Sequence, residues 1–345
     1  MKINKINSFW LILNNVCNNR CQFCYLKEAK LEGTSEMSLG YARDLAEKMK
    51  KAGASNCILI GGEPTLYKDL VKLIETLKHL EIDATLVTNG RRLSNVDYTK
   101  NIIHAGLDRV VVSVEGWDKE SHNLITGARS FKETEVGIKN ALNLGIKTET
   151  LTTISTLNCN NLEGIYRLLT SWGVKTIDFN FAIPQLNEKS QAEWTYTPNL
   201  AKAVENVEKL YLKVISEGRG QLGITGTVPL CLFNQKIVEE LMDKGWVNFG
   251  CHMYWGTGIA FDGSGSILPC THFAGYGIGE KNINVEGKSK VTDFVKFSNS
   301  GLAYKFRKKL FKYPTKKCVE CKYWGYCVGG CPLLWLDKNP DDIIS

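Results

Sequence analysis

Apolar and polar positions along residues 9–215 follow a pattern that predicts strands alternating with helices. Short apolar runs typical of buried strands occur six times. Longer segments between them place apolar residues every three or four positions, as on one face of a helix. The predicted strands are Phe9–Leu13, Cys57–Ile60, Ala84–Thr88, Arg109–Val114, Lys147–Ile154 and Thr176–Phe181, and the predicted helices include Leu39–Ala52, Leu70–Leu80, Phe131–Leu144 and Leu162–Trp172. Repeated β/α units predict an α/β fold with a parallel sheet, and six units fall short of a complete barrel.

The pattern changes twice after this region. Residues 216–250 begin with several glycines and continue into a predicted helix, Phe233–Lys244, so we interpret them as a connecting segment. From Cys251 onward the periodicity fades, while glycine, aromatic and cysteine content rises. The chain is therefore expected to divide into a partial barrel (1–215), a connection (216–250) and a small cysteine-rich domain (251–345).

Composition narrows the class of protein. No apolar run approaches the roughly 18 residues that a membrane-spanning helix needs, and the N-terminal run SFWLIL carries no cleavage-site pattern. Twelve cysteines without an export signal favour metal or cluster ligation in a reducing compartment over disulfides. We therefore expect a cytoplasmic protein with no membrane partner.

Three of these cysteines, Cys17, Cys21 and Cys24, follow the first predicted strand with the spacing C-x3-C-x2-C. An electron-transfer cluster normally takes four cysteines, so three favour a [4Fe–4S] cluster with one iron open to a small molecule. With Phe23 and Tyr25 beside Cys24, the segment resembles the cluster loop of the radical S-adenosylmethionine (radical SAM) enzymes. The resemblance implies a six-unit partial barrel, a SAM ligand on the open iron, and catalysis through a 5′-deoxyadenosyl radical.

Strand ends supply further candidate contacts. Gly61, Gly62 and Glu63 follow the second strand and resemble the family's GGE motif, which holds the SAM amino group. Asn89 follows the third strand, and Ser113 ends the fourth, where the family places a contact to the SAM carboxylate and ribose. Relatives usually carry Arg-Gly where this chain has Thr126-Gly127, so Arg129 is the nearest candidate for the carboxylate clamp.

The C-terminal cysteines resemble the SPASM domain, an auxiliary-cluster module of radical SAM enzymes that modify peptides or proteins. The order is Cys251, Gly265 and Cys270, followed by C-x2-C-x5-C-x3-C at Cys318, Cys321, Cys327 and Cys331. The family's interleaved ligation implies one cluster at Cys251, Cys270 and Cys331 and another at Cys318, Cys321 and Cys327. A tetrahedral zinc site is the structural alternative for these thiols.

Each auxiliary cluster then has three motif ligands, because the family's seventh cysteine would fall beyond Ser345. Cys231 or a substrate thiolate is a candidate fourth ligand for the first cluster. Asp337, Asp341 or Asp342 is a candidate for the second, although carboxylate is a hard ligand for iron–sulfur. A chain that continues past Ser345 is the further alternative.

Two other cysteines and a basic stretch give weaker indications of function. Cys57 opens a buried strand and is expected in the core, and Cys159 is either a neutral loop residue or a hydrogen-atom donor. The net charge is +7, with basic residues gathered in 305–317. That stretch is interpreted as a solvated helix face or as the site of an acidic peptide, since no nucleic-acid recognition motif accompanies it.

These features together predict an enzyme that cleaves SAM and crosslinks a ribosomal precursor peptide by a thioether or C–C bond. The alternatives are formylglycine formation on a sulfatase, peptide epimerisation, and a non-catalytic zinc or iron–sulfur protein. A flavodoxin or ferredoxin is the expected electron donor. Only sixteen residues precede Cys17, so a separate peptide-recognition protein is also expected.

Overall fold

The computed structural model describes residues 2–26, 36–187, 191–218, 220–226, 228–248, 250–274, 286–310 and 314–342. Most of its strands belong to one curved sheet with the order β10-β9-β6-β5-β4-β3-β2-β1-β11-β12. Every neighbouring pair is parallel except β11 and β12. The strands are β1 (Ser8–Ile12), β2 (Asn56–Ile60), β3 (Asp83–Thr88), β4 (Arg109–Ser113), β5 (Lys147–Ile154), β6 (Thr176–Phe181), β9 (Gln221–Thr225), β10 (Val247–Asn248), β11 (Gly258–Asp262) and β12 (Ile267–Leu268).

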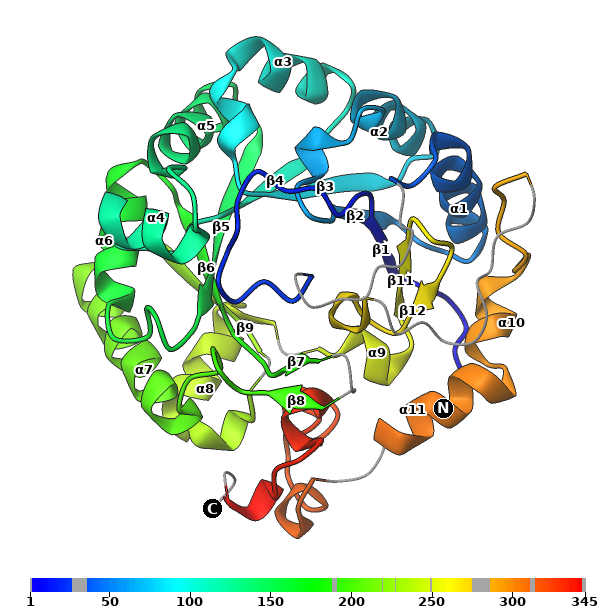
Figure 1. Cartoon of the computed structure of the whole chain (residues 1–345). Coiled ribbons are helices and arrows are strands. Elements are labelled where there is room, and N and C mark those ends of the chain that lie inside the picture. The colour runs from blue at the N-terminus through cyan, green and yellow to red at the C-terminus, as the bar shows by residue number, and fades with distance from the viewer. Residues whose placement is uncertain are drawn as a thin grey trace.

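Helices surround this sheet on its outer side, and the loop after β1 lies inside the ring (Figure 1). A two-stranded ribbon, β7 (Gln185–Leu186) with β8 (Ala192–Glu193), projects beyond the sheet. The helices are α1 (Leu39–Lys51), α2 (Leu70–His79), α3 (Val96–His104), α4 (Lys119–Thr126), α5 (Phe131–Asn143), α6 (Leu162–Ser171), α7 (Leu200–Glu217), α8 (Gln235–Asp243), α9 (His252–Trp255), α10 (Phe294–Ser298) and α11 (Gly301–Leu310).

Local sequence explains these elements. In α1, the Ser38 side chain accepts a hydrogen bond from the backbone N–H of Tyr41 and so caps the helix. The same helix buries one apolar face, formed by Tyr41, Ala42, Leu45, Ala46 and Met49. Six predicted strands and the predicted helices are confirmed, with ends that differ by at most two residues.

The sheet continues past both expected domain boundaries. Strand β9 pairs with β6, and β11 pairs with β1 along its whole length. Residues 221–268 therefore contribute four strands to the sheet, whereas the sequence pattern indicated a connection with one helix followed by a separate cysteine-rich domain. Strand β9 (QLGIT) is short and contains a glycine, which weakens its period-two signal.

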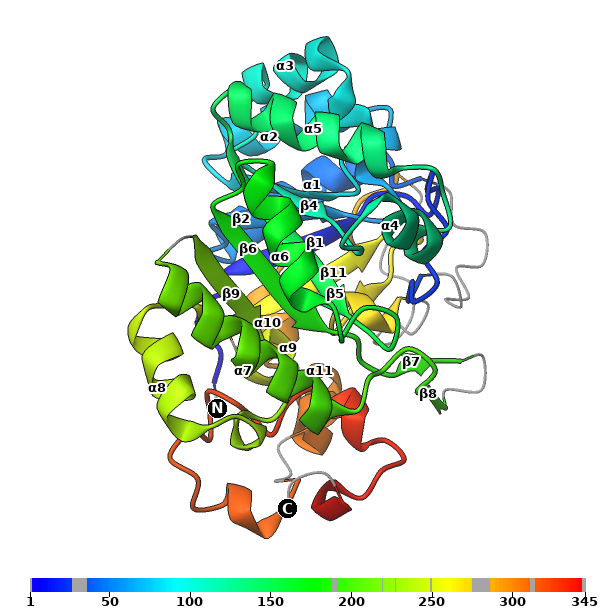
Figure 2. The same cartoon turned by 90° about the vertical axis from the view of Figure 1, so that its left-hand side faces the viewer.

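The chain's last described residues, 314–342, pack below β9, α7 and α8 (Figure 2). Lys322 forms an ion pair with Glu239 of α8, with 2.7 Å between Nζ and Oε1. The Trp194 indole N–H donates to the Asp337 carboxylate at 3.0 Å. Segments distant in sequence are thereby brought together at this end of the molecule.

Candidate functional site

The loop with Cys17, Cys21 and Cys24 leaves the carboxyl end of β1, where parallel α/β sheets bind ligands. Burial raises the pKa of the Cys17 and Cys21 thiols, and repulsion from the other loop thiols and from Glu63 and Glu115 adds to it. Metal ligation requires thiolates. Three mutually repelling thiols fit an iron–sulfur cluster, whose positive irons offset that repulsion.

Gly61 and Gly62 let the two strand extensions approach each other. A Cβ on Gly62 would lie 2.5 Å from the Val16 carbonyl oxygen, and one on Gly61 would lie 2.6 Å from that of Asn14. The Gly62 N–H donates to Asn14 O at 2.8 Å, and the Glu63 N–H donates to Val16 O at 2.8 Å. The glycines therefore hold the backbone that leads directly into Cys17.

We expect Gly62→Ala to displace this backbone and lower the iron bound by the cysteine loop. Side-chain rotation cannot relieve a clash between the new Cβ and backbone atoms. The overpacking is therefore expected to lower the free energy of unfolding by about 1–3 kcal/mol. Iron content after anaerobic reconstitution and urea unfolding of the iron-free chain measure the effect.

Gly40→Ala is the matched control, because a Cβ there meets nothing within 4 Å. It is expected to leave iron content and stability within about 0.5 kcal/mol of the unsubstituted chain. Equal iron content in both variants would show that the close approach at Gly62 does not position the loop.

The Glu63 carboxylate joins the ends of β2 and β3. It is 1% exposed. One oxygen accepts from the Thr65 N–H at 3.0 Å and from the Thr65 and Thr88 hydroxyls at 2.6 Å each. The other oxygen accepts from the Asn89 N–H at 2.8 Å. The carboxylate is thus fixed by protein donors, which the GGE resemblance alone did not indicate.

Polar side chains after β3 support the cysteine loop from the other side. The Asn89 amide donates to Asn18 Oδ1 at 2.7 Å and lies 3.9 Å from Cys17 Sγ. Arg91 donates to the carbonyl oxygen of Asn18 and to Asn19 Oδ1. Arg91 and Thr65 were missed by sequence reasoning, because their roles depend on contacts between strand ends.

The end of α4 holds the middle of the loop. The Arg20 and Gln22 N–H groups donate to the carbonyl oxygens of Thr126 and Ile125 at 2.8 and 3.0 Å. Gly127 has φ +60°, and a Cβ there would lie 2.5 Å from Arg20 O. Arg129 lies exposed just beyond, so its role as a carboxylate clamp stays a prediction. Ser113 lies half-buried at the end of β4, level with these loops.

Glu115 is a buried carboxyl group between β4 and β5. Its Oε2 accepts from the Thr153 N–H at 2.9 Å, and its own N–H donates to His122 Nδ1 at 3.3 Å. Burial raises the pKa of Glu115 to about 8 and lowers the pKa of His122 to about 4. A neutral Glu115 beside a neutral His122 avoids placing a second negative charge near the thiolates.

A pH-dependent stability follows from Glu115. Between about pH 6.5 and 8 the folded chain keeps the Glu115 proton, whereas the unfolded chain, with its ordinary pKa of 4.5, has lost it. Raising the pH therefore favours the unfolded state. The His122 contribution is complete once the pH exceeds its ordinary pKa of 6.5.

We expect the free energy of unfolding of the iron-free chain to fall across this window, and to fall less in Glu115→Gln. Urea unfolding at pH 6.5, 7.2 and 8 measures the slope. If the free energy of unfolding fell equally with pH in the two proteins, a protonated Glu115 in the folded chain would be ruled out.

The C-terminal cysteines form two groups of thiols. Burial and mutual repulsion raise the pKa values of Cys270 and Cys331, with Cys251 as a shared neighbour, so these three lie together. Cys318, Cys321 and Cys327 lie in the second group, and Cys231 lies with them. The suggestion that Cys231 serves the first group is wrong, because the structure places it beside Cys327.

The proposed carboxylate ligands lie elsewhere. Both oxygens of Asp337 face the Trp194 indole N–H, at 3.0 and 3.3 Å. Asp341 is exposed, and the Asp342 side chain lies outside the described residues. In the described part of the chain, no three His, Cys, Asp or Glu side chains lie within reach of a single metal ion.

One contact connects the N-terminal loop with the first C-terminal group. The rings of Tyr25 and His272 pack against each other with centroids 4.6 Å apart and planes tilted by 36°. His272 Nδ1 lies 3.6 Å from Cys270 Sγ, and Tyr25 directly follows Cys24. The two cysteine sites are thus neighbours, which their separation in the sequence does not indicate.

The other two cysteines lie apart from these groups. Cys57 is fully buried in β2, as its position in an apolar run predicted. Cys159 is half-buried, and its carbonyl oxygen accepts from the Asn206 side chain at 2.9 Å. Neither joins the thiol groups.

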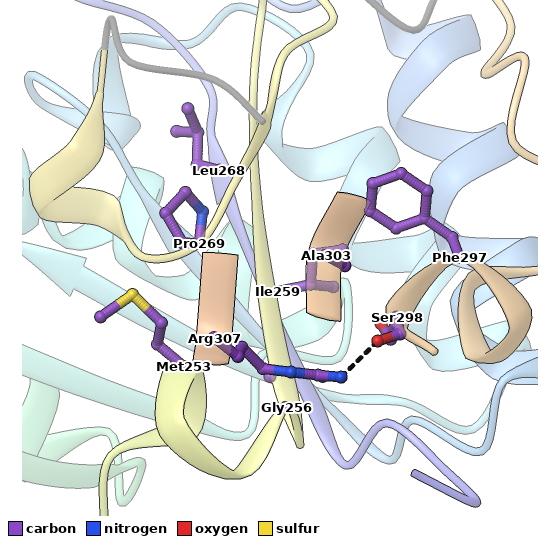
Figure 3. Close-up of a pocket in the computed structure, with 10 residues that line it drawn as sticks. Met253, Gly256, Ile259, Leu268, Pro269, Phe297, Ser298, Ala303 and Arg307 are labelled. Atoms are coloured by element: carbon purple, nitrogen blue, oxygen red, sulfur yellow. Dashed lines mark hydrogen bonds between the residues drawn. The ribbon is translucent and has the colours of Figure 1, made fainter. Parts of the chain in front are cut away.

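Arg307 of α11 departs from the expected solvated helix face. It is 5% exposed, and its guanidinium donates to the carbonyl oxygen of Ser298 at the edge of a small pocket (Figure 3). Gly256 makes room, since a Cβ there would lie 2.1 Å from Arg307 Nη1. Lys305, Lys316 and Lys317 are exposed, so the accessible charge is smaller than the sequence suggests. The Lys308 and Lys309 side chains and Lys312 lie outside the described part.

Solved structures share this fold over nearly the whole chain. SuiB of Streptococcus suis, bound to its precursor peptide SuiA, matches with a TM-score of 0.72 and 18% identity, over 98% of this chain and 74% of SuiB. The enzyme anSMEcpe, with bound AdoMet and a Cp18Cys peptide, matches with a TM-score of 0.70 and 19% identity, over 96% of this chain and 91% of that one. The partial barrel with a cysteine-rich C-terminal region is thereby confirmed as the fold.

Curated relatives match a shorter region. A probable GTP 3′,8-cyclase of Saccharolobus islandicus is 32% identical over 160 residues, which is 46% of this chain. One of Pyrococcus horikoshii is 27% identical over 210 residues and 61% of this chain. The chain spans 50% of the first relative and 67% of the second.

None of the described helices has both the length and the apolar character needed to cross a membrane. Residues 11–169, which contain the cysteine loop and all its supporting strand ends, match the family model described as Radical SAM superfamily. The matched segment is a little under half of the chain, and through it the chain is similar to the members of that superfamily.

Proposed function

We propose that this chain is a SAM-cleaving enzyme that modifies a peptide. The observation that carries the proposal is the loop of Cys17, Cys21 and Cys24, held by the ends of β2, β3 and α4 and next to the thiol group that contains Cys270. A [4Fe–4S] cluster held by these three cysteines would supply the electron that cleaves SAM reductively, and so the radical chemistry that removes a substrate hydrogen.

The chain's own residues hold and shield this centre. Gly61 and Gly62 admit the backbone of residues 14–16, and Glu63 and Asn89 fix the strand ends around Cys17. We propose the same strand ends, with Ser113 and Arg129, as the contacts of SAM. Protein positioning and exclusion of water are what a cofactor of this kind requires.

A peptide is the proposed substrate. The supporting observations are the shared fold with SuiB and anSMEcpe, whose structures contain peptides, and the C-terminal thiol groups of a SPASM-like domain. We propose a thioether or C–C crosslink in a ribosomal precursor as the product. Formylglycine formation and epimerisation are the alternatives for the same radical.

GTP is the substrate named for the curated relatives, and it defines a second candidate function. The first of these matches covers 46% of this chain and 50% of the relative. The C-terminal cysteine groups favour the peptide. Partners proposed for either reaction are a flavodoxin or ferredoxin as electron donor and, for the peptide, a separate recognition protein.

The first test is reductive cleavage of SAM. Anaerobically reconstituted chain with dithionite and SAM is expected to release 5′-deoxyadenosine, measured by liquid chromatography. Absence of that product in protein that carries its full iron would overturn the proposal.

The second test addresses the substrate. Precursor peptides encoded beside this gene are co-expressed with it, and their masses are measured by mass spectrometry. In a parallel reaction the purified enzyme is supplied with GTP. A loss of two hydrogens, or multiples, supports crosslinking, and an unchanged mass with inverted stereochemistry supports epimerisation. Conversion of GTP alone would overturn the peptide assignment.

A further inference from the structure

We propose that Cys231 is the fourth ligand of the auxiliary iron–sulfur cluster held by Cys318, Cys321 and Cys327. The inference rests on the proposed function only in that it takes these thiols as a cluster site. It assigns a ligand from outside the C-terminal motif. It also leaves Cys251, Cys270 and Cys331 as the auxiliary group with three ligands.

Backbone geometry places Cys231 at this site. The segment VPLCLF crosses from β9 to α8, and a short 3-10 helix, Leu230–Leu232, carries the cysteine. The Leu230 N–H donates to Cys327 Sγ at 3.2 Å. The residue before Cys231 therefore already contacts a thiol of the second group.

Buried apolar side chains fix this segment on both sides of the cysteine. Val228, Leu230 and Phe233 are 0–4% exposed and belong to the main core. Cys231, between them, is exposed. The chain thus anchors the neighbours of Cys231 in the core and leaves the side chain of Cys231 itself accessible.

Independent contacts dock the motif cysteines against the same region. Lys322 pairs with Glu239 of α8 at 2.7 Å, and the Tyr326 hydroxyl donates to the Val247 carbonyl oxygen at 3.2 Å. Both residues lie within the C-x2-C-x5-C stretch. The position of Cys231 relative to the motif is therefore set by contacts on both sides of it.

The neighbouring thiols agree with this placement. The thiols of Cys327, Cys318 and Cys321 lie close enough to that of Cys231 to interact with it electrostatically. Four thiolates are the usual protein ligands of one [4Fe–4S] cluster, and carboxylates such as Asp337 are poorer ligands for it. With Cys231 the second group reaches that number from described residues alone.

The test uses the full chain with Cys17, Cys21 and Cys24 replaced by alanine, so that only auxiliary iron is counted. After reconstitution this protein is expected to hold about eight irons, four for each [4Fe–4S] cluster. Adding Cys231→Ala is expected to lower the iron content and to change the electron paramagnetic resonance spectrum of the reduced protein. Cys231→Ser, which offers an oxygen ligand, is expected to restore iron with an altered spectrum.

Cys159→Ala is the matched control, because Cys159 is a partly exposed cysteine outside both thiol groups. It is expected to change neither iron nor spectrum. Identical iron, sulfide and spectra in Cys231→Ala and in its parent would overturn the proposal. Zinc in place of iron in the parent protein would overturn it as well.

A measurement without substitution at Cys231 guards against misfolding of the variant. Cys231 is exposed in the metal-free fold, so iodoacetamide is expected to label it there and to spare it in cluster-loaded protein. Equal labelling in both states would contradict ligation. Because the test protein lacks the SAM-binding loop cysteines, its outcome does not depend on whether the unsubstituted chain cleaves SAM.

Discussion

Replacing Cys17, Cys21 and Cys24 together by alanine is expected to abolish the release of 5′-deoxyadenosine from SAM. The substitution removes every thiol of the N-terminal loop, so no cluster remains to donate the electron. Bound iron should fall by about four atoms per chain, the content of one [4Fe–4S] cluster. Chromatography of the dithionite-driven reaction and iron analysis of the same sample measure both changes.

Cys57→Ala is the control for this prediction, because Cys57 is buried in β2 and lies outside all three thiol groups. It should retain both iron and cleavage. Cleavage that persists in the triple variant would move the reactive cluster to the C-terminal thiols. Loss of all iron would instead show that the loop is needed for the fold of the auxiliary sites.

Glu63→Ala is expected to destabilise the iron-free chain by about 3 kcal/mol or more. The change leaves the Thr65 and Thr88 hydroxyls and the Asn89 N–H without their shared acceptor. Each unsatisfied buried donor costs about 1–3 kcal/mol. Urea unfolding of the iron-free proteins gives the difference in free energy.

Two further variants separate the carboxylate contacts from a general effect of losing a glutamate. Glu47→Ala removes an exposed glutamate of α1 and should stay within about 0.5 kcal/mol of the unsubstituted chain. Glu63→Gln keeps one carbonyl acceptor, so its free energy of unfolding should lie between those of Glu63→Ala and the unsubstituted chain. If Glu63→Ala were no less stable than Glu47→Ala, the carboxylate would not hold β2 and β3 together.

Local sequence patterns specified most of the barrel. Strand β5 and helix α5 were predicted within one residue because their apolar spacing matches the geometry of a strand or a helix directly. Cysteine spacing predicted the candidate cluster loop in the same way, since its three cysteines lie within eight residues of one another. Such patterns are local, so they can be interpreted without any knowledge of the fold.

Contacts between distant segments carried no such signal. Strand β11 adds to the sheet by pairing with β1, and nothing in GIAFD names its partner. Arg307 looks like one of several surface cations, but α11 turns it toward the core and Ser298. Glu63 was recognised through a motif, while its four hydrogen bonds depend on how β2 and β3 end beside each other.

The sequence by itself therefore determined the α/β fold, the cluster loop and the list of cysteines, because spacing along a chain fixes local geometry and ligand type. Only the tertiary structure decided that Cys231 lies with the thiols of Cys318, Cys321 and Cys327. Cys231 is 87 residues from Cys318 in the numbering of the chain, and the packing of α8 against residues 314–342 brings them together. Ligand sets depend on distances in space, and those are set by the packed core.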